Sequence, residues 1–168
     1  MGMDVIGKKK DSYFRNNVWW WRPLWNYCKS VAPEICDKVQ HGQTNDGDGL
    51  NAEDSAALAK ILKDNLANGQ CDRYERQYKA WQASLPMEKC ELCNATGIRT
   101  DKVGVDGNMP NRELSIEQAK KYGRTQGWCN GCDGKGDKEN WQAHYPFSVD
   151  NVQEFADFLE GCGGFEIW

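Results

Sequence analysis

Two Cys-x-x-Cys pairs constrain this chain more than any other feature. Cys90 and Cys93 form the first pair, and Cys129 and Cys132 form the second. Two residues between paired thiols let each pair hold one edge of a tetrahedral ion, so that both pairs complete a four-thiolate shell. Zinc is the usual ion in such a shell, and four thiolates leave no position for a catalytic water. The spacing therefore predicts a single structural Zn²⁺ bound by these four cysteines.

A redox role is the competing interpretation of any Cys-x-x-Cys pair. Both pairs here run on into glycine-containing turns, NATG after Cys93 and DGKG after Cys132, which favours metal binding. Residues 1–17 are polar and lack the apolar core of an export signal, so we expect a cytoplasmic protein whose thiols stay reduced. The other four cysteines have no short partner spacing, and we expect them to be buried core thiols: Cys28, Cys36, Cys71 and Cys162.

The second pair with its turn, Cys129 to Gly136, resembles the CxxCxGxG repeat in the zinc-binding region of DnaJ-type co-chaperones. The first pair departs from that repeat because Ala95 stands at the first glycine position. If the position needs a positive φ, alanine costs about 1 kcal/mol there, and the two zinc knuckles are expected to differ in shape. A DnaJ-type region has more repeats than this chain and follows a J-domain signature that is missing here. The resemblance therefore implies the zinc knuckle and not the co-chaperone activity.

Hydrophobic patterning predicts an α+β core, a small sheet with packed helices, and an inserted zinc-knuckle subdomain. We expect strands at 3–6 and 18–21, and a terminal strand at 165–168 that pairs with the opening strand. The expected boundaries are 1–85 plus 141–168 for the core and 86–140 for the zinc-binding insert.

Capping residues and apolar stripes predict the helices. The first follows Pro23, a short one follows Pro33, and the last begins after Ser148. The clearest helix covers 51–68, and the next, 71–85, is expected to pair with it as a hairpin across Asn68-Gly69. Inside the insert, 101–111 is expected to be an exposed loop, and a capping box at Ser115 predicts a short helix to Tyr122.

The segment RNNVWWWRPLW, residues 15–25, is unusually aromatic. Aromatic residues on both faces of a strand mean either burial on both sides or one face open to a ligand that stacks on the rings. Burial is preferred, because a chain of this length needs its largest side chains inside. The alternative is a ligand site that includes the following residues: Arg15, Asn16, Asn17, Trp19 and Trp21.

The loop TNDGDGL, residues 44–50, is similar to an EF-hand or dockerin calcium loop. Thr44 stands in place of the first carboxylate and Ser55 in place of the bidentate glutamate, so we expect no high-affinity calcium site. A tight turn before the 51–68 helix is the preferred interpretation. The alternative keeps His41, Asp46 and Asp48 as a polar cluster that faces a cleft.

Charge and composition narrow the classes of partner. The chain carries 21 basic and 25 acidic residues, a formal net charge of −4, so nucleic acid stays possible as a partner but is not favoured. At 39% hydrophobic residues the chain is too apolar for disorder, yet no apolar run is long enough to cross a membrane. GxSxG, P-loop, GxGxxG and HExxH motifs are missing, so evidence for an enzyme is thin.

Nearly the whole chain resembles a family of small proteins encoded by bacteriophages and bacteria, through MGMDV, FRNNVWWWRPLW, NDGDGL, GWCNGCDGKG and CGGFEI. The resemblance implies phage or prophage origin and a setting in the host cytoplasm. Two hypotheses follow. The first is a zinc-stabilised, non-enzymatic accessory protein that binds a host or phage macromolecule. The alternative is an enzyme or nucleotide- or small-ligand-binding protein, which requires the polar residues of 15–17 and 41–48 to converge in one pocket.

Overall fold

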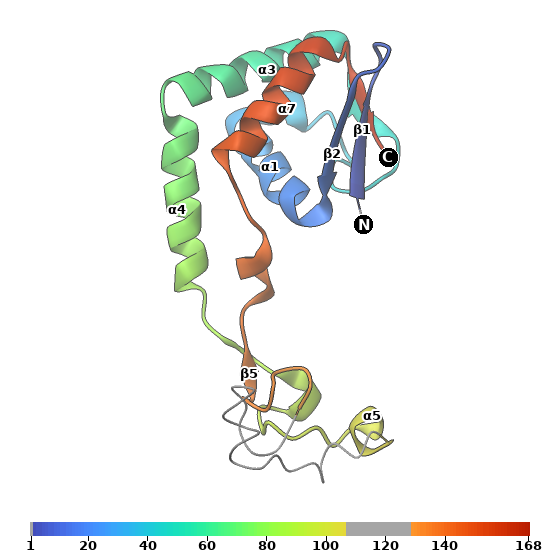
Figure 1. The fold of residues 1–168 in the computed structure, drawn as a ribbon. Helices are drawn as coiled ribbons and strands as arrows, with labels where there is room; N and C mark the ends of the chain where they lie inside the picture. The colour runs from blue at the N-terminus through green and yellow to red at the C-terminus, as the bar shows by residue number, and fades with distance from the viewer. Residues whose placement is uncertain (1, 107–128) are drawn as a thin grey trace. The chain divides into compact units, whose positions relative to one another are not determined.

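The chain divides into two units. The structure, a computed structural model, describes residues 2–106 and 129–168. Unit 1 comprises residues 1–84 and 144–168, and unit 2 comprises residues 85–143. The boundaries expected from the sequence lie within three residues of these. Strands and helices occur together in unit 1, which confirms the α+β class (Figure 1).

A four-stranded antiparallel sheet forms one side of unit 1, in the order β2-β1-β6-β3. The strands are β1 (Gly2–Gly7), β2 (Tyr13–Asn17), β3 (Asp48–Leu50) and β6 (Phe165–Ile167). Val5 on β1 lies opposite Ile167 on β6, so the expected pairing of the terminal strand with the opening strand is confirmed. Alternation along β6 buries Phe165 and Ile167 and leaves Trp168 half exposed.

The expected strand at 18–21 is wrong, because these residues begin helix α1 (Val18–Val31). The side chain of Asn17 accepts hydrogen bonds from the backbone amides of Trp19 and Trp20, which satisfies two amides of the first turn. Helical spacing then turns Trp21 and Trp25 to the same buried face. The predicted helix after Pro23 therefore starts five residues earlier, and a short helix α2 (Pro33–Cys36) follows it as expected.

Helices α3 (Ala52–Ala67) and α7 (Val149–Gly161) lie side by side (Figure 1). The side chains of Asn51 and Ser148 cap them as the sequence predicts. The Nζ atom of Lys63 on α3 lies 3.0 Å from Asp157 and 2.6 Å from Glu160 on α7. The 51–68 helix therefore packs along the last helix of the chain.

The expected hairpin between α3 and α4 (Gln70–Ser84) is not formed. Figure 1 shows α4 running away from α3 at a sharp bend rather than back along it. Gly69 adopts a left-handed φ of +75°, and the Asn68 side chain accepts a hydrogen bond from the Gln70 amide, which starts the next helix at once. Because α4 begins directly at this bend and does not return along α3, α3 packs on α7 instead.

The core of unit 1 lies between the inner sheet face and helices α1 and α7. The Phe14 ring on β2 lies 5.1 Å from that of Phe155 on α7, and the Trp25 ring on α1 lies 6.4 Å from that of Phe165 on β6. The four cysteines expected to be core thiols are free and buried, as predicted: Cys28, Cys36, Cys71 and Cys162.

Unit 2 contains short elements only, in the part that the structure describes. They are β4 (Glu88–Lys89), the 3-10 helix η1 (Glu91–Cys93), α5 (Lys102–Asp106), β5 (Asp137–Lys138) and the 3-10 helix η2 (Trp141–His144), whose last residue belongs to unit 1. The predicted loop at 101–111 thus opens with a short helix. The helix predicted from Ser115 to Tyr122 lies outside the described residues.

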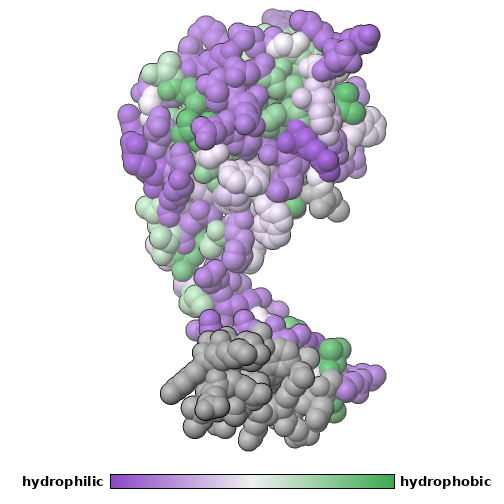
Figure 2. Space-filling view, in the orientation of Figure 1, coloured by the Kyte–Doolittle hydropathy of each residue, from purple (hydrophilic) through white to green (hydrophobic). Residues whose placement is uncertain are grey.

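The visible face of unit 1 is mostly hydrophilic, with apolar side chains showing singly or in small groups (Figure 2). Across residues 2–106 and 129–168, the helices are all too short or too polar to cross a membrane.

Candidate metal centre

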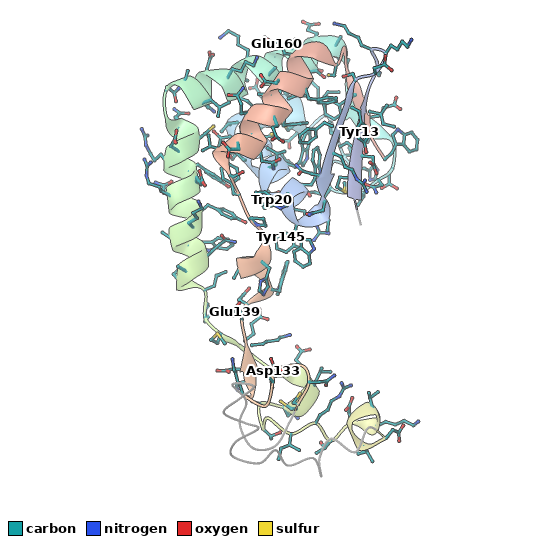
Figure 3. The ribbon with its side chains drawn as sticks, in the orientation of Figure 1. Tyr13, Trp20, Asp133, Glu139, Tyr145 and Glu160 are labelled. Atoms are coloured by element: carbon teal, nitrogen blue, oxygen red, sulfur yellow. The ribbon has the colours of Figure 1, made fainter. Side chains whose placement is uncertain are left out.

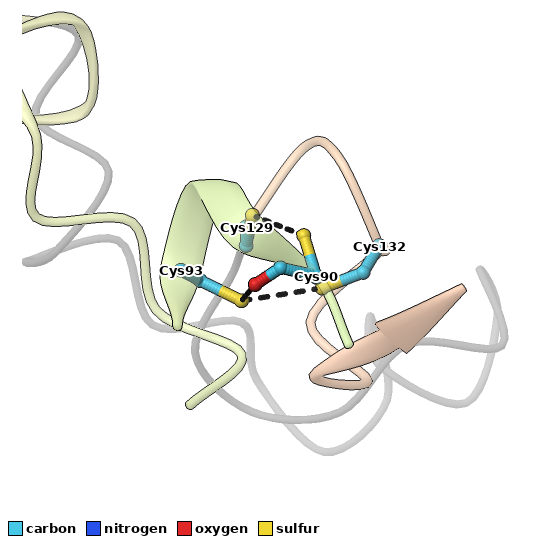
Figure 4. A group of neighbouring side chains, drawn as sticks. All are labelled: Cys90, Cys93, Cys129 and Cys132. Carbon is cyan, nitrogen blue, oxygen red and sulfur yellow. Dashed lines mark hydrogen bonds between the residues drawn. The ribbon is translucent and has the colours of Figure 1, made fainter. Parts of the chain in front are cut away.

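Four buried cysteine thiols gather in unit 2 (Figure 4). Cys90 immediately precedes η1 and Cys93 ends it, while Cys129 and Cys132 lie on the turn that leads to β5. Pairing of β4 with β5 draws the two Cys-x-x-Cys segments together. The structure therefore brings to one place all four ligands that the sequence spacing predicts.

The distances between the sulfur atoms fit a tetrahedral ion. Cys90 Sγ lies 3.9 Å from Cys129 Sγ, Cys93 Sγ lies 3.7 Å from Cys132 Sγ, and all four sulfur atoms lie within 4.8 Å of one another. Metal–sulfur bonds of about 2.3 Å give a tetrahedron with edges of about 3.8 Å, whereas a disulfide needs about 2.05 Å. The thiols are free, and their separation suits a shared metal ion rather than a disulfide.

The two turns after the cysteine pairs follow the same backbone course. The Ala95 amide donates to the carbonyl of Cys90, and the Gly134 amide donates to that of Cys129, both at 3.1 Å. Ala95 has a φ of +64° and Gly134 a φ of +77°, so both adopt the left-handed conformation. The expectation that Ala95 makes the knuckles differ in shape is therefore wrong. The matching turn forms in spite of a left-handed alanine, which costs about 1–2 kcal/mol.

Two further glycines allow the turns to pack against each other. A Cβ atom at Gly97 would overlap the carbonyl oxygen of Gly134, and a Cβ atom at Gly136 would overlap that of Ala95. Gly97 and Gly136 also have positive φ values of +76° and +86°. Glycine is therefore required at both positions by close backbone approach as well as by conformation.

Backbone amides and burial set the ionisation of the thiols. The Gly136 amide donates to Cys132 Sγ over 3.2 Å. Burial raises the pKa of the Cys129 thiol to about 12 and also raises the pKa of Cys132. Burial acts in the same direction on Cys93, but hydrogen bonds from the Gly97 amide and the neighbouring cysteines outweigh it and lower that pKa to about 7. A bound metal ion would favour the thiolate form of all four buried groups.

We expect Ala95→Gly to raise the stability of unit 2 by about 1 kcal/mol, because glycine adopts the left-handed conformation without steric cost. Gly134→Ala, the same exchange at the matching position, is expected to lower it by a similar amount. The stability of unit 2 in both variants is measured by thermal unfolding, with a metallochromic dye to report any release of metal. A fall in stability on Ala95→Gly would mean that the extra freedom of glycine in the unfolded chain outweighs the strain relieved.

The polar residues at the end of β2 point to both sides of the strand. Arg15 lies on the outer sheet face, where its Nε atom is 3.4 Å from the carboxylate of Asp4. The next side chain points the other way, so that Asn16 donates to Asn151 on α7 over 2.8 Å. Asn17 is occupied as the cap of α1. Arg15 and Asn17 thus lie on one face of β2 and Asn16 on the other, and a ligand at this segment stays a prediction.

The tryptophans of the same segment divide between core and surface. Trp21 and Trp25 are buried and stack with ring centroids 5.5 Å apart. Trp20 is half-buried, and Trp19 is 44% exposed with its ring 4.6 Å from that of Tyr145. Burial therefore holds for the two rings on the inner face of α1, while Trp19 is open to solvent.

His41, Asp46 and Asp48 do lie close together, the first two on the exposed loop before β3 and the third at its first residue. The carboxylate of Asp48 accepts hydrogen bonds from the backbone amides of His41 at 2.9 Å and Gly49 at 2.8 Å. The first of these hydrogen bonds is the main reason that the pKa of Asp48 is lowered. Asp46 accepts from the Thr44 hydroxyl and lies 3.9 Å from His41 Nδ1. These bonds tie the loop into a tight turn, and the absence of a high-affinity calcium site stays a prediction.

Arg99 is a residue of unit 2 that sequence reasoning missed. It is 8% exposed, and its guanidinium donates to both carboxylate oxygens of Asp101, at 2.6 and 2.8 Å. A third bond runs over 2.9 Å to the side-chain oxygen of Asn130, inside the second cysteine pair. An arginine two residues from an aspartate is too common a pattern to be read as a signal.

Tyr145 was missed as well, although it anchors the chain that leads back to α7 (Figure 3). Its ring lies against Trp19, and its hydroxyl accepts a hydrogen bond from Arg22 over 3.1 Å. Its carbonyl oxygen accepts from the Tyr78 hydroxyl and from the side-chain amide of Gln82, at 3.0 and 2.8 Å. The segment before α7 is thus held between α1 and α4 by contacts that no local pattern predicts.

Comparison with known protein families, curated proteins and solved structures gives no match to this chain. Fold and site together define an α+β protein that carries a candidate metal centre of four cysteines.

Proposed function

We propose that the four cysteines bind one structural Zn²⁺ and that the protein is a zinc-stabilised binding protein without catalytic activity. The observation that carries the proposal is the set of sulfur distances, 3.7 and 3.9 Å, close to the edge of a tetrahedral tetrathiolate site. Four thiolates close the coordination shell, so the ion would fix the two knuckles together and would leave no place for a substrate or a catalytic water.

The scarcity of other buried side chains in unit 2 supports a structural role for the ion. Among the described residues of this unit, the buried apolar cluster consists of the four cysteines alone: Cys90, Cys93, Cys129 and Cys132. A segment without its own apolar core needs another source of folding free energy, and structural zinc sites supply it in small domains. Bound zinc would therefore decide whether unit 2 is folded.

A binding role is favoured over the alternative of an enzyme or small-ligand protein. The alternative needs Arg15, Asn16 and Asn17 to face one pocket, and Asn16 points to the opposite side of β2 from Arg15. Apolar side chains on unit 2 are instead open to solvent, with exposed fractions of 44% for Leu92 and 57% for Val103. Such side chains suit contact with another protein. We propose a host or phage protein in the host cytoplasm as the partner, following the resemblance to phage and bacterial proteins.

The zinc content of the purified protein tests the proposal. We expect about one zinc per chain after dialysis, measured by mass spectrometry of the elements, because a closed tetrathiolate holds zinc tightly. Cys132→Ser is expected to lose the metal, and Cys36→Ser, which changes a thiol in unit 1, is expected to keep it. Metal-free wild-type protein, or iron in place of zinc, would contradict the proposal.

The binding role is tested with wild-type protein, Cys132→Ser and Cys36→Ser, each immobilised and exposed to lysate from cells that carry the protein. We expect one partner that is retained by wild-type protein and by Cys36→Ser and is lost with Cys132→Ser. A partner held equally by all three would show that unit 2 is not the binding unit.

A further inference from the structure

Several contacts hold the Arg99 side chain in place near the cysteines. Its guanidinium joins Asp101, on the chain that leaves the first knuckle, to Asn130, between the cysteines of the second. Gly104 packs directly on it, since a Cβ atom there would overlap both the side chain and the carbonyl of Arg99. The Gly104 amide also donates to Asp101 over 3.0 Å. These contacts hold the arginine in one orientation.

The net charge of the proposed zinc site suggests what Arg99 does there. Four thiolates outweigh one divalent ion, so the occupied site carries net negative charge in a place shielded from water. Among the charged residues that the structure describes, Arg99 alone is less than a tenth exposed. The hydrogen bond to Asp101 is the main cause that raises the pKa of Arg99, and attraction to Cys129 and Cys90 adds to it. The hydrogen bond to Asn130, which stands between Cys129 and Cys132, places the guanidinium beside the second cysteine pair.

We propose that Arg99 is an outer-sphere positioning residue of the zinc site, which offsets the negative charge of the tetrathiolate and links the two knuckles through Asn130. The inference rests on the proposed zinc function. Groups that hold or neutralise metal ligands from outside the coordination shell change metal affinity by about 10- to 100-fold in other sites. Asp101 orients the guanidinium through two hydrogen bonds and partly balances its positive charge. The negative thiolates would also be attracted to the guanidinium.

The experiment compares zinc affinities, measured by competition with a chromogenic chelator. We expect Arg99→Met to weaken zinc binding by about 10- to 100-fold. Lys102→Met is the matched control, because it removes one positive charge from the same unit at a side chain that is 89% exposed. It is expected to change the affinity by less than about two-fold. Arg99→Lys keeps the charge without the planar fork and is expected to fall between wild type and Arg99→Met.

The absorption bands of Co²⁺, used as a probe in place of zinc, separate a weakened site from a lost one. Tetrathiolate bands at saturation in Arg99→Met would show that the shell still assembles and that only affinity changed. If Arg99→Met gives no Co²⁺ bands, the Arg99→Lys variant is used instead. Tetrathiolate bands in Arg99→Lys support a role for the positive charge, and their absence overturns it. Equal zinc affinities for Arg99→Met and Lys102→Met would also overturn the inference. Wild-type protein that binds no zinc would instead remove the proposed function on which it rests.

Discussion

Trp21→Ala is expected to lower the free energy of unfolding of unit 1 by about 3–5 kcal/mol, the loss typical of deleting a fully buried tryptophan. The ring has no exposed surface, stacks 5.5 Å from that of Trp25 and meets the edge of Phe155 at 5.5 Å. Its Nε1 atom donates to the carbonyl of Gly42 over 2.7 Å. The substitution therefore leaves a cavity and also a buried carbonyl without its partner.

Thermal unfolding measures this effect, and a fall of about 10–20 °C corresponds to the expected loss. Trp21→Phe keeps most of the ring contacts but not the hydrogen bond, and is expected to lose less. Trp19→Ala, two positions before Trp21 in the first turn of α1 and 44% exposed, is the matched control, with a loss below about 1 kcal/mol. Equal melting temperatures for Trp21→Ala and wild type would show that the ring is not part of the core.

Cys132→Ser is expected to unfold unit 2 and leave unit 1 folded. The four cysteines make up the buried cluster of unit 2 among its described residues, and the core of unit 1 is a separate cluster built on the sheet and helices. Loss of one ligand would open the proposed tetrahedral shell, and the free energy that bound zinc would contribute to holding the knuckles would be lost with it. The change is therefore local in spite of its size.

Hydrogen exchange measures the protection of each backbone amide and so tests which unit unfolds. We expect the amides of β4, β5 and the two turns to lose protection while those of α1, α3 and α7 keep it. Cys162→Ser is the reciprocal control, because this buried thiol of unit 1 donates to the Leu159 carbonyl over 3.4 Å and lies outside the metal site. It is expected to weaken unit 1 and to retain zinc. Loss of protection throughout the chain in Cys132→Ser would show that the units unfold together.

Features that depend on neighbouring residues could be predicted from the sequence. The spacing within Cys90–Cys93 and Cys129–Cys132 defines the candidate ligands, because the geometry of two thiols on one ion is set within four residues. Asn51 and Ser148 mark the starts of α3 and α7, because a cap bonds to amides of its own first turn. The terminal strand could be predicted from the alternation of apolar and polar side chains, which also depends only on its own residues.

Features that depend on residues distant in the sequence were decided by the tertiary structure. The start of α1 was misread because aromatic residues suit both strands and helices, and burial against the sheet and α7 favours the helix. Ala95 takes a left-handed φ because the turn must pack against Gly136 of the other knuckle. Arg99 gains its role only when Asn130 is brought beside it. Local hydrogen bonds and ligand spacing are encoded within a few residues, whereas packing and charge compensation depend on which distant side chains the fold makes neighbours.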